Sequence, residues 1–142
     1  MKNKINIVLV DDIKFSRKVI SYIINKHFDD QVNIIEANNS NDVQSIFSKN
    51  IKIHGIISDI MMPNGDGVEL INILSSNNYK IPMVIVSSLT TKVIEQTMEQ
   101  AESGGVNILS AFKKPILAED IIMSIENFLL QNMIHSRGEH YV

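Results

Sequence analysis

The 142-residue sequence predicts a doubly wound α/β fold, in which one parallel sheet carries helices on both faces. Five short, mostly apolar runs, the first of them rich in β-branched residues, alternate with five amphipathic stretches along the chain. The runs are mostly apolar throughout, which is typical of strands buried on both faces of a parallel sheet. No internal repeat or low-complexity linker interrupts the first 135 residues. For five strands the common order is 2-1-3-4-5, and we expect that order here.

Each predicted element follows from its apolar pattern. The predicted strands are Ile5–Val10, Val32–Ala37, Gly55–Ser58, Pro82–Ser87 and Asn107–Phe112. Apolar residues at three- and four-residue spacing predict helices over Ile13–Phe28, Asn41–Ser48, Gly67–Leu74, Lys92–Ala101 and Leu117–Met133. In the first helix, the stripe expected to face the core contains Phe15, Val19, either Tyr22 or Ile23, and Ile24. We expect one domain over residues 1–134 and a flexible tail over 135–142, because the tail lacks periodicity.

Composition excludes several classes of protein. The net charge of −3 argues against a broad electrostatic contact with nucleic acid or an anionic membrane. The absence of cysteine removes disulfides, zinc–thiolate sites and thiol nucleophiles. No apolar run is long enough to span a bilayer, and the amino terminus does not resemble a signal peptide. We therefore expect a soluble cytoplasmic protein.

Polar side chains follow four of the five predicted strands. They are Asp11 and Asp12 after the first strand, Asp59 after the third, Ser87 at the end of the fourth, and Lys113 and Lys114 after the fifth. Each has an ordinary structural explanation alone: a helix cap, a turn residue, a strand-end hydroxyl or a solvated charge. In this fold, however, the carboxyl ends of parallel strands line the functional crevice. The sequence therefore predicts that these groups converge.

Such a cluster suits phosphoryl chemistry. Neighbouring carboxylates repel each other, and a hard divalent cation such as Mg²⁺ removes that repulsion. An aspartate beside the cation can attack a phosphoryl group, while an ammonium and a hydroxyl contact the transferring oxygens. There is no glycine-rich phosphate loop, and the Asp-x-Asp of aspartate-nucleophile phosphatases is replaced by Asp11-Asp12. An enzyme of that type is therefore only weakly supported.

Residues 4–133 resemble the receiver domain of two-component response regulators. The matching segments are IVLVDD, IISDIMMPNGDGVEL, IPMVIVSS and KKP. The resemblance implies a flavodoxin-like receiver fold, with Asp59 as the phospho-acceptor, charged by a histidine kinase or a small phosphodonor. It implies Mg²⁺ bound by Asp59, by Asp12 directly, by Asp11 through water and by the backbone carbonyl of Met61. Ser87 becomes the hydroxyl that turns toward the phosphoryl group, and Lys114 the cation, with Lys113 at the surface.

Some positions depart from the family pattern. Gly65 stands where the family usually has Met, and Ala111 replaces the aromatic switch residue, so the usual hydroxyl–aromatic relay is absent. Phe112 is adjacent to Ala111 but is expected on the other face of its strand. The long connection over 102–109 is similar to receivers of EAL-type cyclic-di-GMP phosphodiesterases, whereas residues 86–90 are similar to chemotaxis methylesterase receivers. The Lys114–Pro115 bond is a candidate cis peptide.

The resulting prediction is a phosphorylation-dependent binding switch that turns over no external substrate. The alternative is a pseudo-receiver that binds a partner constitutively, and a phosphatase is a remoter option. The expected partners are a sensor histidine kinase or phosphotransfer protein and an effector protein or fused output domain. A homodimer could use the fourth helix, fifth strand and fifth helix; no direct contact with nucleic acid or membrane is expected. Apolar Met61 and Leu89 predict slow self-dephosphorylation, and His27, His54, His135 and His140 are expected at the surface.

Overall fold

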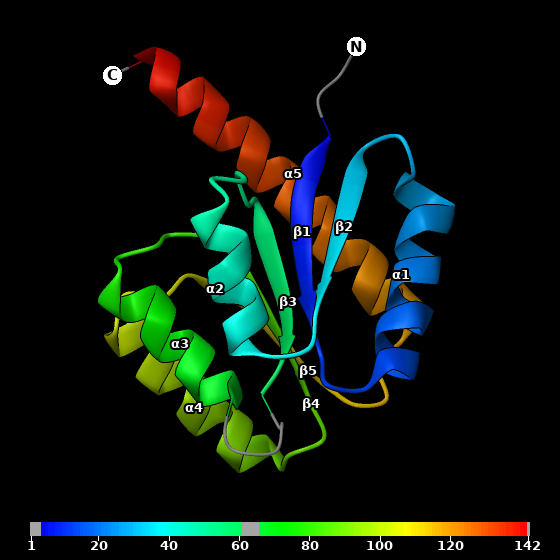
Figure 1. The fold of residues 1–142 in the computed structure, drawn as a ribbon, viewed down its shortest axis with the longest axis vertical. Coiled ribbons are helices and arrows are strands. Elements are labelled where there is room, and N and C mark those ends of the chain that lie inside the picture. Colours follow the sequence, from blue (N-terminus) through cyan, green and yellow to red (C-terminus); the bar gives the residue numbers. More distant parts are fainter. Residues whose placement is uncertain (1–3, 61–65, 142) are drawn as a thin grey trace.

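The computed structural model describes residues 4–60 and 66–141, which form a five-stranded parallel sheet between two layers of helices (Figure 1). The strand order β2-β1-β3-β4-β5 confirms the predicted order. The strands are β1 (Ile5–Val10), β2 (Val32–Ala37), β3 (Gly55–Asp59), β4 (Met83–Ser87) and β5 (Ile108–Lys113). The helices are α1 (Lys14–Phe28), α2 (Ser40–Ser48), α3 (Asp66–Ser76), α4 (Thr91–Ser103) and α5 (Ala118–Tyr141).

Two apolar cores lie on opposite faces of the sheet, because successive side chains of a strand point in opposite directions. On β1, Val8 and Val10 pack into the core beneath α2, α3 and α4. Ile7 and Leu9 pack into the core beneath α1 and α5. Figure 1 shows these two helix layers on either side of the strands. With both faces covered, the strands are nearly continuous apolar runs, as the sequence indicated.

Helix α1 buries a different stripe from the predicted one. Ile20, Ile24 and Phe28 are buried, whereas Phe15 and Tyr22 are 76% and 68% exposed. The buried stripe also contains Arg17 and Ser21. Because these two residues are polar, apolar spacing in the sequence does not indicate this stripe. The prediction for Phe15 and Val19 was therefore wrong, and both side chains lie on the outer surface.

Helix α5 extends beyond the sheet. It continues to Tyr141, so the predicted end at Met133 is too early. In Figure 1 its last turns project past the amino ends of the strands. Apolar periodicity marks only the part of a helix that packs on a core, so it could not show these turns. No helix in the described part of the chain is both long and apolar enough to span a bilayer.

Strand β5 forms one edge of the sheet and is irregular. Met83 pairs with Ile108, but Val84 pairs with Ser110, so Leu109 is an additional residue in the register. Beyond this bulge Ala111 packs toward the core beneath α4 and Phe112 toward the core beneath α5. The expectation that these two neighbours point to opposite faces is confirmed.

Candidate functional site

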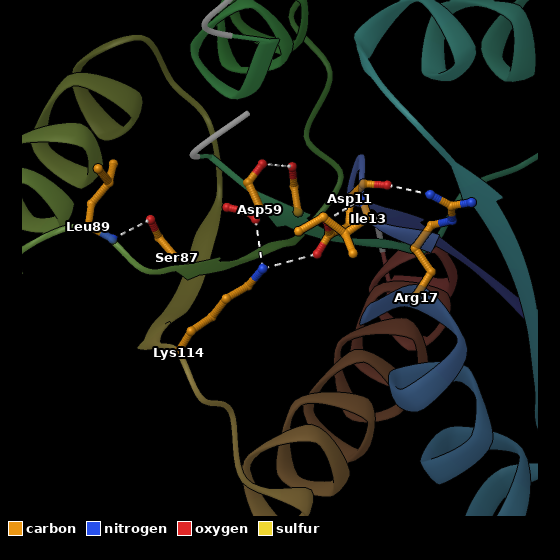
Figure 2. Close-up of polar contacts among 8 residues, drawn as sticks. Asp11, Ile13, Arg17, Asp59, Ser87, Leu89 and Lys114 are labelled. Carbon is orange, nitrogen blue, oxygen red and sulfur yellow. Dashed lines mark hydrogen bonds and ion pairs between the residues drawn. The ribbon is translucent and has the colours of Figure 1, made fainter. Parts of the chain in front are cut away.

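The polar residues that follow the strands lie together at the carboxyl edge of the sheet. Asp11 follows β1, Asp59 ends β3, Ser87 ends β4 and Lys114 follows β5. Figure 2 shows Lys114 directed at Asp11 and Asp59, while Ser87 is turned toward Leu89. The parallel arrangement of the strands creates this site, because it brings residues from four distant segments to one edge.

Three carboxylates form the acidic part of the site. One oxygen from each of Asp11, Asp12 and Asp59 lies within 4.8 Å of the others. Asp11 and Asp59 are only 2% and 5% exposed, whereas Asp12 is open to solvent. At that separation two unit charges repel by about 3–4 kcal/mol for an effective dielectric constant near 20. The cluster is therefore costly unless positive charge accompanies it.

Lys114 supplies part of that charge. Its Nζ donates to Asp59 Oδ2 at 2.8 Å and to Asp11 Oδ2 at 3.1 Å. Burial by itself lowers the pKa of Lys114, but the hydrogen bond and charge of Asp59, followed by those of Asp11, raise the pKa above its ordinary value. Lys114 is thus an ammonium ion held between two carboxylates. Its neighbour Lys113 is exposed, as predicted.

Main-chain contacts fix where Lys114 leaves the sheet. Its backbone N–H donates to the carbonyl oxygen of Ser87 at 2.8 Å, which extends the β4–β5 pairing by one bond. The Lys114–Pro115 peptide bond is cis, which confirms the sequence-based prediction. The hydrogen bond to Ser87 gives the Lys114 side chain a defined starting position beside the end of β4.

The hydroxyl of Ser87 has a local partner in this structure. Ser87 is fully buried, and its Oγ accepts a hydrogen bond from the backbone N–H of Leu89 at 3.1 Å. Thr90 then caps α4, its side chain accepting from the N–H of Val93 at 3.4 Å. The hydroxyl, the loop after β4 and the start of α4 thus form one connected segment.

The donor set fits a hard divalent cation. Three carboxylates converge, and no sulfur ligand lies in the group found among the described residues. Oxygen ligands and access to water through exposed Asp12 are what Mg²⁺ prefers. With Lys114 counted, two negative charges are left, which a divalent cation would neutralise. Met61, whose backbone carbonyl was predicted as a ligand, and Gly65 lie outside the described residues.

Sequence reasoning missed a charged group behind the carboxylates. Arg17 is buried and donates from Nη1 to the main-chain oxygen of Asp11 at 2.6 Å. Its Nε donates to Glu36 Oε1 at 3.1 Å, and Lys18 donates to Glu36 Oε2 at 2.8 Å. The Asp11 carboxylate also accepts from the N–H of Ile13 at 2.9 Å. In the sequence, Arg17 is a single basic residue on the predicted first helix. Because the apolar stripe of that helix was predicted on another face, Arg17 was not expected to be buried.

Family comparison agrees with this geometry. The family model described as the response regulator receiver domain matches residues 7–126. A curated relative from Shewanella denitrificans, named protein-glutamate methylesterase/protein-glutamine glutaminase 1, is 29% identical over 140 residues, covering 97% of this chain and 34% of the relative. A relative of the same type from Shewanella frigidimarina is 30% identical over 136 residues, covering 94% of this chain and 32% of the relative. This chain thus spans about a third of their length.

Solved structures have the same fold. The signal receiver domain of a putative Luxo repressor protein from Vibrio parahaemolyticus superposes with a TM-score of 0.80 at 17% identity, covering 96% of this chain and 98% of that one. Chemotaxis response regulator CheY4 of Vibrio cholerae gives a TM-score of 0.70 at 17% identity, covering 89% and 99%. The methylesterase relatives agree with the likeness noted for residues 86–90. They do not test the likeness to EAL-type regulators.

Proposed function

Because the chain belongs to the response regulator receiver domain family and is thereby a phosphorylation-dependent signalling switch, we propose that Asp59 is the residue that accepts the phosphoryl group. The observation that carries this assignment is the pair of contacts from Lys114 to Asp59 and Asp11. They bring a carboxylate nucleophile, a cation and further acidic ligands to one edge of the sheet. Asp11 and Asp59 both belong to the acidic cluster and both accept from Lys114, but Asp59 accepts at the shorter distance and Asp11 also accepts from the N–H of Ile13.

The proposed chemistry is a single displacement at phosphorus. A carboxylate oxygen of Asp59 forms a bond to the phosphorus of a phosphohistidine or small acyl phosphate, and the bond to the donor's nitrogen or oxygen breaks. The leaving group takes the bonding electrons, and the product is an aspartyl phosphate. Lys114, already an ammonium ion, would then move from sharing two carboxylates to contacting a phosphoryl oxygen.

Asp11, Asp12 and Asp59 are the described residues proposed to hold Mg²⁺. The cation would supply charge neutralisation for the incoming phosphoryl oxygens. Asp12 suits direct coordination because it is exposed, while Asp11 is buried and already bonded to Ile13 and Lys114. The carbonyl of Met61 stays a predicted ligand.

Ser87 is proposed to report phosphorylation to the rest of the molecule. In this proposal its hydroxyl, which is turned toward Leu89, rotates away from the N–H of Leu89 and donates to a phosphoryl oxygen on Asp59. That change would release the loop that ends at Thr90, the cap of α4. With Ala111 in place of the aromatic switch residue, we propose that this loop carries the signal without an aromatic side chain.

The proposed partners follow from the family to which the chain belongs and from its relatives. A histidine kinase or phosphotransfer protein is the proposed donor, and a downstream effector or output domain the proposed target. The methylesterase relatives make an enzyme a reasonable output, whereas these residues themselves are proposed to turn over no external substrate. A cytoplasmic location stays a prediction.

We also propose a homodimer through α4, β5 and α5. Strand β5 is an edge strand with no fully buried residue, and Val93, Met123 and Leu130 expose apolar side chains on the flanking helices. Sedimentation across a concentration series tests this proposal, with Met123→Glu expected to weaken association and Tyr22→Glu, on exposed α1, expected not to. A monomer at all concentrations, phosphorylated or not, would exclude the dimer.

Intact mass spectrometry tests the phospho-acceptor. With Mg²⁺ and acetyl phosphate, we expect the wild-type chain to gain one phosphoryl mass and Asp59→Asn to gain none. Asp30→Asn, an exposed site with the same charge change, should behave as wild type. Absence of any mass gain, or of a Mg²⁺-dependent spectral change with beryllofluoride, would support the pseudo-receiver. Sustained turnover of an added phosphoester would support the phosphatase.

A further inference from the structure

A pocket lies at the amino ends of the strands, whereas the carboxylates lie at the carboxyl ends. Its volume is about 400 Å³, within the range of small-molecule sites. The loops that precede β3, β4 and β5 form one side, and the second half of α5 forms the other through Gln131, Asn132 and His135. Since the strands are parallel, the amino ends that surround this pocket are far from Asp59.

The walls of the pocket are held by backbone contacts. The N–H of Asn6 donates to Nδ1 of His54 at 2.9 Å, and the N–H of His54 donates to the carbonyl oxygen of Asn6 at 2.8 Å. Lys80 Nζ donates to the carbonyl oxygen of Gly105 at 3.1 Å, and Asn107 accepts from the N–H of Met83 at 2.8 Å. All three loops are therefore tied to neighbouring elements, so the pocket is formed before any ligand arrives.

Among the described residues that line this pocket, the charged and titratable ones are all basic. Lys52, Lys80, His54 and His135 line it, and none of its lining residues is acidic, although the chain as a whole carries a net charge of −3. Because Nδ1 of His54 accepts from Asn6, the ring carries its hydrogen on Nε2 and can donate there. The described residues that line the pocket thus include two lysines, an imidazole with an N–H and side-chain amides, and none of these lining residues carries a carboxylate.

An apolar surface lies beside these donors. Ile53, Ile81 and Pro82 line the same pocket, and Ile53 is buried. A ligand with a charged head and a small apolar body would satisfy both parts. Two lysines match a dianion better than a monoanion, and hydrogen bonds from ammonium groups to phosphate are among the stronger ones.

We propose that this pocket binds a small organic phosphate, with the phosphate against Lys52, Lys80 and His54 and the apolar body against Ile81 and Pro82. The ligand would bridge the strand loops and α5, and so fix the direction in which the projecting end of that helix leaves the domain. This site is separate from the phosphorylation chemistry and does not depend on it.

Phenyl phosphate is the probe, titrated into the full chain in EDTA and followed by amide ¹H–¹⁵N spectra. Without a divalent cation the acidic cluster repels phosphate, so the distant site is measured alone. We expect saturable shifts at His54, Asn107 and Asn132, and binding about tenfold weaker in the double variant Lys52→Gln/Lys80→Gln. The matched double variant Lys26→Gln/Lys92→Gln removes two exposed charges elsewhere and should bind as wild type. Asp59→Asn should also bind phenyl phosphate as wild type does, whether or not Asp59 proves to be the phospho-acceptor.

Three further ligands sharpen the test. Benzyl alcohol keeps the apolar body without the charge, benzoate carries one charge, and inorganic phosphate lacks the body. Each should bind at least about tenfold more weakly than phenyl phosphate. Equal binding of any of them, equal binding by the Lys52→Gln/Lys80→Gln variant, shifts centred on Asp11 and Asp59, or no saturation would each overturn the proposal.

Discussion

The guanidinium of Arg17, on α1, donates a 2.6 Å hydrogen bond to the main-chain carbonyl oxygen of Asp11, in the loop after β1. The same side chain reaches Glu36 on β2. The pKa of Glu36 is lowered by the hydrogen bond from Lys18, against the opposing effect of burial, and further by the hydrogen bond from Arg17. Helix α1, strand β2 and the loop after β1 are thereby joined directly behind the acidic cluster, and the backbone that carries Asp11 and Asp12 is held in place.

Replacing Arg17 should therefore weaken metal binding as well as stability. In Arg17→Gln the carbonyl of Asp11 loses its charged donor, and we expect the affinity for Mg²⁺ to fall about tenfold and the free energy of unfolding by about 1–3 kcal/mol. Calorimetric titration and urea unfolding measure the two quantities. Lys18→Gln removes only the exposed partner of Glu36 and should keep the affinity. Val43→Ala loses stability in a distant core; if it weakened Mg²⁺ binding equally, positioning by Arg17 would be refuted.

Lys114→Gln should separate metal binding from phosphoryl transfer. Lys114 donates hydrogen bonds to two of the carboxylates that the cation would use, and so competes with the cation for them. We therefore expect the variant to bind Mg²⁺ at least as tightly as wild type. Phosphorylation by acetyl phosphate should nevertheless slow about a hundredfold, because the charge that contacts the phosphoryl group is lost. Time-resolved mass spectrometry gives the rate.

Lys113→Gln is the matched control, since it removes the same charge from the adjacent exposed residue. It should leave both the rate and the affinity unchanged. A normal phosphorylation rate in Lys114→Gln would show that the contacts of Lys114 serve only to balance charge in the resting state.

The sequence predicted which residues meet at the candidate site better than it predicted the hydrogen bonds that these residues make. Asp11, Asp59, Ser87 and Lys114 could be brought together without coordinates, because strand ends in a parallel sheet share one edge. The hydrogen-bond partners of these residues could not be predicted from the sequence. The Ser87–Leu89 hydrogen bond depends on a rotamer, which apolar spacing does not report.

Contacts between polar residues far apart in the chain were missed for the same reason. Arg17 meets Glu36 across 19 positions, and Asn6 meets His54 across 48, so neither pair leaves a local pattern. His54 was expected at the surface but is half-buried. The bulge at Leu109 also escaped prediction, since its run of apolar residues fits a regular strand equally well.

His54 should make stability depend on pH. Burial, followed by the charge of Lys52, lowers the pKa of His54 below its ordinary 6.5. Protonation of Nδ1 would also remove the acceptor for the N–H of Asn6. The unfolded chain therefore binds the proton at higher pH than the folded chain. The stabilisation is fully present above about pH 6.5 and is lost as the pH falls through the folded-state pKa.

Urea unfolding at pH 7.5 and pH 5.5 measures this effect. His54→Asn keeps an acceptor near the position of Nδ1 but cannot titrate, so it should lose less stability between the two values than wild type. His27→Asn, at an exposed position on α1, should retain the wild-type dependence. An identical pH dependence in wild type and His54→Asn would exclude His54 as the responsible group.

Leu89 should make the phosphorylated state long-lived. Its backbone N–H donates to the hydroxyl of Ser87, and its half-buried side chain packs against the core beneath α4. That apolar side chain offers no group that could orient a water molecule for attack on an aspartyl phosphate. We expect the purified domain to keep its phosphoryl group for minutes or longer, and Leu89→Gln, which adds an amide, to shorten that lifetime several-fold. Decay of the phosphoryl mass after removal of acetyl phosphate measures both. Leu117→Gln makes the same change at an exposed position before α5 and should not alter the decay. A wild-type lifetime of only seconds would contradict the role assigned to this apolar position.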